Sequence, residues 1–232
     1  MMAPGQCRFP AVRRVVGGAA HVVDVGMQEL AVPEPLASRI AGANDVDTLT
    51  RTIALAFADD PVWDPAMGGA ATTVDQKAAI WRLYVAGSVR YPWSSVVGDG
   101  AAVSIWLPPG GTELDDAGHA ALADLLESTL GASAATEFHA LADRFEANHP
   151  VDVPHAYLSL LATRPDQRGR GIGMALLADD LRRLDALHLP AWLESTNPVN
   201  DQRYQSVGFE PVGSFRTIDE RRVITTMWRP PR

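Results

Sequence analysis

The strongest constraint on the fold of this chain is a strand-like run that leads through a glycine-rich segment into a helix-like run, all within residues 155–184. The first run, HAYLSLLAT, is short, mostly apolar and bounded by turn residues, as in a buried strand. The second, IGMALLADDLRRL, repeats its apolar residues at the spacing of one helical face. Gly169, Gly171 and Gly173 stand at alternate positions just before and at the start of the second run. This order of elements indicates a mixed α/β domain.

The rest of the chain alternates between strand-like and helix-like segments. Before residue 155 we expect a strand near 38–41, a helix capped at Asn44 or Asp45 and ended by Pro61, and a second helix over 73–90. Two strands within 94–108 joined by a Gly-Asp-Gly turn and two helices within 117–148 separated near Gly131 should follow. After the glycine-rich segment we expect a helix to about residue 187, a strand over 191–195, a short helix ending at Gly208, and strands near 209–215 and 223–228. Residues 33–232 are therefore predicted to form one α/β (α+β) domain, with residues 1–32 as a partly ordered extension.

Composition and charge exclude several classes of protein. With 232 residues and 47% hydrophobic composition, the chain can bury one substantial core. No apolar run approaches the roughly 20 residues of a membrane span, so we expect no membrane association. The net charge of −8 argues against nucleic acid as a partner. The scattered histidines predict no metal site, and the single cysteine fits a reducing compartment. We expect a cytoplasmic monomer or homodimer.

The glycine-rich turn has the features of an anion site. A helix start carries unpaired N–H groups and the positive end of the helix dipole, and glycines let a ligand approach the backbone closely. Three arginines, at 164, 168 and 170, add charge suited to phosphate. The dinucleotide-binding fingerprint needs a third glycine where this chain has Met174 or Leu176, and no Gly-Lys-Ser/Thr ending is present. The turn alone could also be only a tight connection.

The segment from Arg168 to Gly173, RGRGIG, resembles the Arg/Gln-x-x-Gly-x-Gly signature of the GNAT acyl-CoA N-acyltransferases. Asn200 and Tyr204 fall in a matching N-x-x-x-Y-x-x-x-G-F segment that ends at Phe209. The chain is most similar to the puromycin N-acetyltransferase group, through AFADDP, DGAAVSIW, LPAWLESTNPVN and RYQSVGF in the same order. The resemblance covers about residue 38 to the C-terminus, and 110–148 differs in detail.

The resemblance implies a single GNAT-like domain whose mixed sheet has splayed fourth and fifth strands flanked by helices. It also implies acetyl-CoA as a co-substrate, with its pyrophosphate on the loop amides and its pantetheine arm along the fourth strand. The cofactor-binding residues carried over in this way are Leu161, Ala162, Thr163, Arg168, Gly169, Arg170, Gly171, Ile172, Gly173, Met174 and Asn200.

The implied reaction is direct attack of an amine on the thioester. An alkyl amine has a pKa of about 10 and must lose a proton, while the leaving thiolate benefits from a proton donor. The resemblance implies Tyr204 as that donor, although a tyrosine there can also simply pack its ring. Glu194 is the candidate base, acting through water. Weaker candidates are Asp59, Asp60 and His155. The two aspartates more simply form the solvated end of the helix before Pro61, and a histidine at a strand edge is more often a surface residue.

For the acceptor we expect Trp63, Trp106 and Tyr157 among the contact residues, although most such aromatics belong to a core. The sequence thus predicts an N-acetyltransferase that moves an acetyl group from acetyl-CoA to the amine of a small molecule, such as an antibiotic, a polyamine or another metabolite. Two alternatives stay open. One is an acetyltransferase for protein N-termini or lysines, and the other is a non-catalytic acyl-CoA-binding module.

Overall fold

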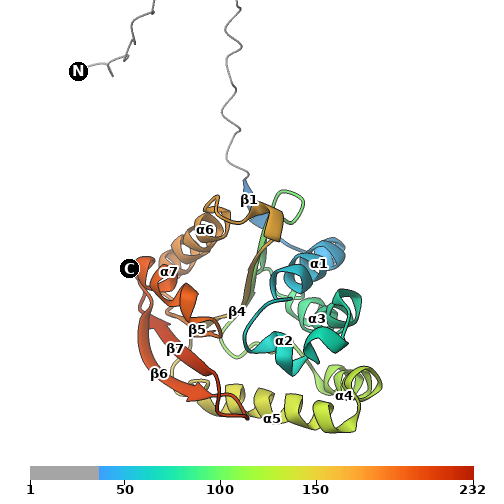
Figure 1. The fold of residues 1–232 in the computed structure, drawn as a ribbon. Coiled ribbons are helices and arrows are strands. Elements are labelled where there is room, and N and C mark those ends of the chain that lie inside the picture. The colour runs from blue at the N-terminus through green and yellow to red at the C-terminus, as the bar shows by residue number, and fades with distance from the viewer. Residues whose placement is uncertain (1–36) are drawn as a thin grey trace, which may run out of the picture. The chain divides into compact units, whose positions relative to one another are not determined.

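A computed structural model describes residues 37–232, so the predicted extension over residues 1–32 lies outside the described residues. The seven strands of the described part form one sheet in the order β1-β2-β3-β4-β5-β7-β6 (Figure 1). Their bounds are β1 Ser38–Ile40, β2 Ser95–Val97, β3 Ala102–Leu107, β4 Ala156–Thr163, β5 Ala191–Ser195, β6 Glu210–Arg216 and β7 Val223–Arg229. The predicted mixed sheet flanked by helices is confirmed.

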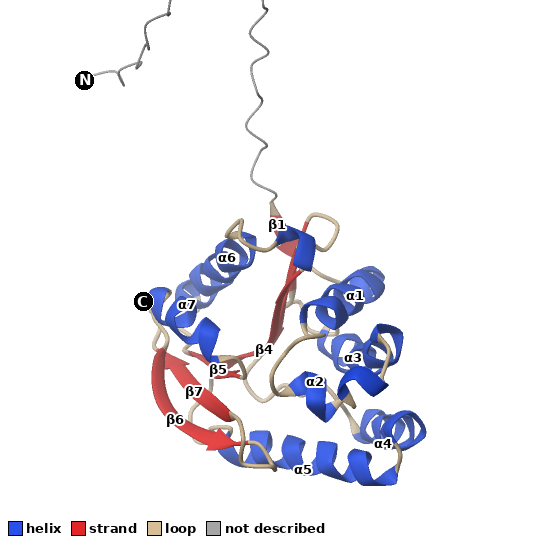
Figure 2. Cartoon of the chain, in the orientation of Figure 1, coloured by secondary structure: helices blue, strands red, loops and turns tan. Residues whose placement is uncertain are grey.

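Helices cover both faces of this sheet (Figure 2). They are α1 Val46–Ala56, α2 Trp63–Ala66, α3 Val74–Ser88, α4 Asp116–Leu130, α5 Ala132–Asn148, α6 Ile172–Ala186 and α7 Asp201–Ser206, with 3-10 turns at Ala43–Asp45, Gly69–Ala71, Pro165–Gln167 and Pro198–Asn200. Apolar residues of α1, α3, α4 and α5 form one core with the sheet, and those of α6 form a second. None of the helices described is long and apolar enough to cross a bilayer.

Local sequence signals explain where several helices begin. Thr73 caps α3 in a capping box with Gln76, and the Asp115 side chain accepts a hydrogen bond from Gly118 N at the start of α4. Helix α2 was not predicted, because Pro61 was expected to end the helical segment. The chain turns helical again because Asp60 Oδ1 accepts hydrogen bonds from the N–H groups of residues 62 and 63, each at 2.9 Å.

The predicted splay of the fourth and fifth strands is visible in the pairing. β4 and β5 run parallel but pair only at Ala156–Ala191 and Tyr157–Trp192. Beyond Tyr157 they separate, while β3 continues to pair with β4 as far as Thr163 on its other edge. The edge of β4 that faces β5 therefore has free backbone groups over most of its length.

A β-bulge in β4 lies at the point where the two strands separate. The register with β3 shifts between Ile105 and Trp106, so that Ser159 has no partner in β3. The bulge reverses which face the following side chains occupy. Leu158 packs in the core with α6, whereas Leu160 packs in the core with α1 and α3.

A buried carboxylate on α6 hydrogen bonds to the sheet. Asp180 accepts hydrogen bonds from Ser95 Oγ at 2.9 Å, Ser104 Oγ at 2.5 Å and the Trp106 indole N–H at 2.9 Å. It also pairs with Arg183. Burial raises the pKa of this carboxyl, while these hydrogen bonds and the arginine lower it. The network fixes α6, and with it the glycine-rich turn, relative to β2 and β3.

Gly87 in α3 should resist substitution. A Cβ at Gly87 would overlap the backbone carbonyl oxygen of Glu113, so Gly87→Ala must displace either α3 or the loop before α4. We expect a loss of about 1–3 kcal/mol of unfolding free energy in urea, although alanine favours a helix by about 1 kcal/mol. Gly118→Ala in α4 is the control, because its Cβ would stay 3.3 Å from its nearest neighbours. Stabilisation by Gly87→Ala would contradict this packing.

Candidate active site

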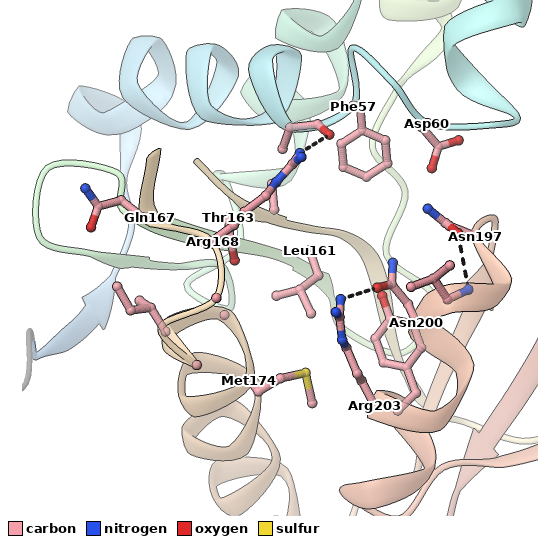
Figure 3. A pocket seen from close by; sticks show the side chains of 18 of the residues that line it. Phe57, Asp60, Leu161, Thr163, Gln167, Arg168, Met174, Asn197, Asn200 and Arg203 are labelled. Carbon is pink, nitrogen blue, oxygen red and sulfur yellow. Dashed lines mark hydrogen bonds between the residues drawn. The ribbon is translucent and has the colours of Figure 1, made fainter. Parts of the chain in front are cut away.

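A cleft of about 630 Å³ opens between β4, the start of α6, the end of α1 and α7 (Figure 3). Its lining comes from four separate parts of the chain. The lining residues are Ala56, Phe57, Asp59, Asp60, Leu161, Ala162, Thr163, Gln167, Arg168, Gly169, Gly171, Ile172, Gly173, Met174, Asn197, Val199, Asn200, Arg203 and Tyr204. All but one of the residues that the sequence assigned to the cofactor line this cleft, the exception being Arg170.

The three glycines of the turn meet two physical requirements, a left-handed backbone and a close approach to β4. Gly169 and Gly171 have φ values of 77° and 75°, in the left-handed region that favours glycine. Gly173 lies in the first turn of α6, where a Cβ would overlap the Thr163 hydroxyl oxygen. The turn therefore lets α6 begin in close contact with the end of β4.

The start of α6 presents a row of free donors. Within residues 37–232, no backbone N–H group from Gly169 to Met174 has a hydrogen-bond partner, and the first paired one is that of Ala175, which donates to Gly171 O at 2.9 Å. No side chain caps the helix. Because these N–H groups lie at the positive end of the helix dipole, the turn fits an anion such as a pyrophosphate.

The arginines of the turn do not act together as expected. Arg168 lines the cleft and donates through Nη2 to the carbonyl oxygen of Ala56 at 2.8 Å, which links the turn to the end of α1 (Figure 3). Arg164 is paired with Asp166 and does not line the cleft. Arg170 does not line it either. Backbone donors therefore outnumber guanidinium groups at this turn.

Sequence reasoning missed Arg203, which lines the opposite side of the cleft. Its Nη1 donates to Asn200 Oδ1 at 2.8 Å (Figure 3). The signal that could have found it is helical spacing, because Arg203 follows Asn200 by three positions and precedes Tyr204. Arg203 adds a cation on the α7 side of the cleft.

Tyr204 lies in the cleft with a free hydroxyl group. Its ring packs on Phe209 at a centroid distance of 6.1 Å, and the hydroxyl has no hydrogen-bond partner in the described part of the chain. Burial, together with the negative charges of Asp60 and Asp201, raises the pKa of Tyr204 to about 12. Tyr204 therefore stays protonated at neutral pH and can donate a proton or a hydrogen bond into the cleft.

Glu194 does not line this cleft. Its side chain is 2% exposed, and Oε1 accepts a hydrogen bond from the Trp192 indole N–H and lies 3.5 Å from His149 Nδ1. It belongs to a second group of polar side chains, which we call the carboxylate cluster, made of Glu113, Glu194, Tyr157, Ser159 and His149. Sequence reasoning missed Glu113, Ser159 and His149.

The weaker base candidates are held by other contacts. Asp60 already accepts two backbone hydrogen bonds, and its Oδ2 accepts a third from Thr196 Oγ1 at 2.7 Å. His155 Nδ1 lies 2.7 Å from the carbonyl oxygen of Val153, and burial lowers the pKa of this imidazole. Asp59 lines the cleft and is exposed.

The structure separates the three aromatic residues expected at the acceptor. Trp106 is 1% exposed and lies in the core, where its indole N–H donates a hydrogen bond to Asp180. Trp63 stacks on Phe145 at 5.1 Å and lies outside the cleft lining. Tyr157 is in the carboxylate cluster. In residues 37–232, no group of three or more acidic, histidine or cysteine side chains could hold a metal ion.

Comparison with solved structures identifies the fold. A Corynebacterium glutamicum protein described as histone acetyltransferase HPA2 and related acetyltransferase is 25% identical with a TM-score of 0.58, over 84% of this chain and 96% of that one. Polyamine N-acetyltransferase of Drosophila melanogaster is 16% identical with a TM-score of 0.56, over 84% and 99%. The C-terminal condensation domain of Ebony, solved with β-alanyl-dopamine, is 10% identical with a TM-score of 0.60, over 84% and 98%. No family model matches the chain.

These similarities support the GNAT superfamily, and the chain has the GNAT acetyltransferase fold. The Ebony domain has the same fold and is a condensation domain, so the fold alone does not define the reaction. The nearer resemblance to the puromycin N-acetyltransferase group stays a prediction.

The four tyrosines of the chain should titrate in two classes. A hydrogen bond from Thr112 N lowers the pKa of Tyr91, whereas burial raises the pKa of Tyr84, Tyr157 and Tyr204. We expect one tyrosinate to form in the folded protein by about pH 10 and no other below about pH 11, as measured by tyrosinate absorbance. Tyr91→Phe should abolish that step. Two or more tyrosinates near pH 10 would contradict the burial described here.

Proposed function

We propose that this protein is an acetyl-CoA-dependent N-acetyltransferase acting on the amine of a small molecule. The observation that carries the proposal is the row of free N–H groups from Gly169 to Met174, which opens into the same cleft as the free hydroxyl of Tyr204. An anion-binding helix start and a proton donor in one cleft are what a phosphorylated thioester requires.

The residues fit the co-substrate along the length of the cleft. The turn amides and Arg168 would hold the pyrophosphate, with Arg203 and Asn200 on the facing wall. The free edge of β4 at Leu161 and Thr163 can hydrogen bond an extended pantetheine arm as a strand partner would. Bound acetyl-CoA supplies an activated acetyl group and a thiol as leaving group.

Tyr204 and Glu194 would handle the protons. An ammonium substrate has three protons on nitrogen, and the amide product keeps one of them. Tyr204 donates one proton toward the departing sulfur and regains one from the nitrogen. Glu194 takes the other, through water, and releases it toward His149 and solvent. One proton therefore ends on the thiol and one in solvent.

A second candidate function is acetylation of protein lysines, which the name of the Corynebacterium glutamicum neighbour favours. It requires an acceptor approach wide enough for a polypeptide. Acetylation of lysine peptides but of no small amine would favour the protein lysine acetyltransferase over the small-molecule N-acetyltransferase.

Acetyl-CoA should stabilise the folded protein. At about 100-fold over its dissociation constant, a ligand that binds only the folded state adds about 2.7 kcal/mol, which is measured as a shift in thermal unfolding. Gly171→Asp should abolish the shift, because it places a carboxylate where the anion binds. No shift in the folded wild-type protein would overturn the proposed function.

The control for this experiment is Gly110→Asp. Gly110 has a φ of 72°, matching the 75° of Gly171, and a Cβ there also has no atom within 4 Å. The two variants therefore carry the same backbone strain and charge change. Only Gly171→Asp should lose the acetyl-CoA shift.

Tyr204→Phe should lower kcat by roughly a hundredfold or more, since it removes the proton donor without disturbing the ring packing on Phe209. The acetyl-CoA dissociation constant should change little. Thiol release measures the first quantity and thermal shift the second, with Tyr91→Phe as control. An unchanged kcat would remove Tyr204 from the mechanism.

A further inference from the structure

The carboxylate cluster lies at the point where β4 and β5 separate. Tyr157 and Trp192 form the last residue pair between the two strands. Ser159 and Glu194 each come two residues later, so both lie at the second position beyond the fork. Ser159 is also the bulged residue of β4, and its hydroxyl donates to the carboxylate of Glu113.

Glu113 is brought to this point by the packing of its loop. It lies between β3 and α4, and its backbone carbonyl rests on Gly87 of α3, where a larger residue would not fit. Two tertiary contacts therefore hold Glu113 at the fork, its backbone against α3 and its carboxylate against Ser159 of β4.

The charges of the cluster are not balanced within the described part of the chain. Neither Glu113 nor Glu194 pairs with an arginine or a lysine there, and His149 is the only basic side chain within salt-bridge distance of either. Burial raises the pKa of the Glu113 carboxyl and the negative charge of Glu194 raises it further, while Ser159 and His149 oppose this less strongly. Two buried carboxylates without a cation are unfavourable unless a ligand supplies one.

A half-buried tyrosine near Glu113 also has a hydroxyl without a hydrogen-bond partner in residues 37–232. Tyr84 donates no hydrogen bond to any described residue, and burial followed by the charge of Glu113 raises its pKa. Its ring lies 6.0 Å from that of Trp81, which lies 5.3 Å from that of Phe57 in the lining of the cofactor cleft. A wall of aromatic rings thus links the cleft to the cluster. Such rings also favour a cation over their faces.

We propose that Glu113 and Glu194 bind the ammonium group of the acceptor between them at the fork of β4 and β5, with the hydroxyls of Ser159 and Tyr84 completing the site. The acceptor is then an alkyl amine, cationic at neutral pH, and neither an aromatic amine nor an alcohol. This inference rests on the proposed function and names the substrate class of that same site.

The same arrangement accounts for the loss of the proton from the ammonium group. The proton passes through water to Glu194, and the nitrogen keeps the electron pair that then attacks. From Glu194 the proton can reach His149, whose Nδ1 lies 3.5 Å from Oε1 and whose side chain is 28% exposed to solvent. Binding of the cation and removal of its proton therefore both use Glu194.

The test measures binding of 2-phenylethylamine and spermidine, each in the presence of coenzyme A, by calorimetry on the full chain. The matched neutral probe is 2-phenylethanol. We expect binding of at least one amine and none of the alcohol. Glu113→Gln should weaken amine binding by roughly tenfold or more, because it removes one charged partner while keeping the acceptor oxygen for Ser159. The control is Glu137→Gln, on the exposed face of α5.

The stability of the ligand-free Glu113→Gln variant distinguishes ligand binding by Glu113 from a structural role. The pKa of the Glu113 carboxyl is higher in the folded than in the unfolded protein. Its ionisation therefore lowers the unfolding free energy as pH rises above the unfolded pKa, and this loss is present at neutral pH. Glu113→Gln should leave the ligand-free protein at least as stable as wild type at neutral pH. Clear destabilisation would make Glu113 a structural residue and overturn the inference.

Failure of this inference differs from failure of the proposed function. If acetyl-CoA does not stabilise the wild-type protein, the proposed function falls. Three results would show that the cluster is not the acceptor site while acetyl-CoA still binds. Neither amine binds, the alcohol binds as well as the amine, or Glu113→Gln binds the amine like wild type. In each case the proposed function stands.

Discussion

The separation of β4 and β5 is the feature on which the rest of the structure depends. Each strand is held along its outer side, β4 by six residue pairs with β3 and β5 by five with β7. Their inner edges share only two pairs. Backbone groups left without a strand partner must find another one, in water or in a ligand. The fork is thus both the unfinished part of the sheet and the place where a molecule can bind as a strand would.

The two sides of the fork have opposite electrostatic character. On the α6 side, free N–H groups from Gly169 to Met174 and the helix dipole favour an anion. On the side of α3 and α5, Glu113 and Glu194 favour a cation. A chain with a net charge of −8 can therefore attract a phosphate, because local backbone dipoles outweigh the overall charge at short range. A reaction between an anionic co-substrate and a cationic amine suits this division.

Much of the fold, and the cofactor side of the site, follow from patterns within short stretches of the sequence. The glycine-rich turn, the Gly-Asp-Gly hairpin and the cap at Thr73 each act over a few residues, and the structure contains all three. The short helix after Pro61 was missed because its cap, Asp60, was interpreted as the solvated end of the preceding helix. Trp106 was expected near the acceptor, but a hydrogen bond to the buried Asp180 of α6 holds it in the core.

The sequence by itself determined that a strand passes through a glycine-rich turn into a helix, because these elements depend on short runs of neighbouring residues. It also supplied the position of Tyr204 relative to Asn200, since helical spacing is local. Only the tertiary structure decided that Glu113 meets Ser159, because that contact joins residues 46 positions apart through a bulge and a glycine of α3. No spacing rule links such residues. They come together only when the sheet, its fork and the helices that cover it have packed.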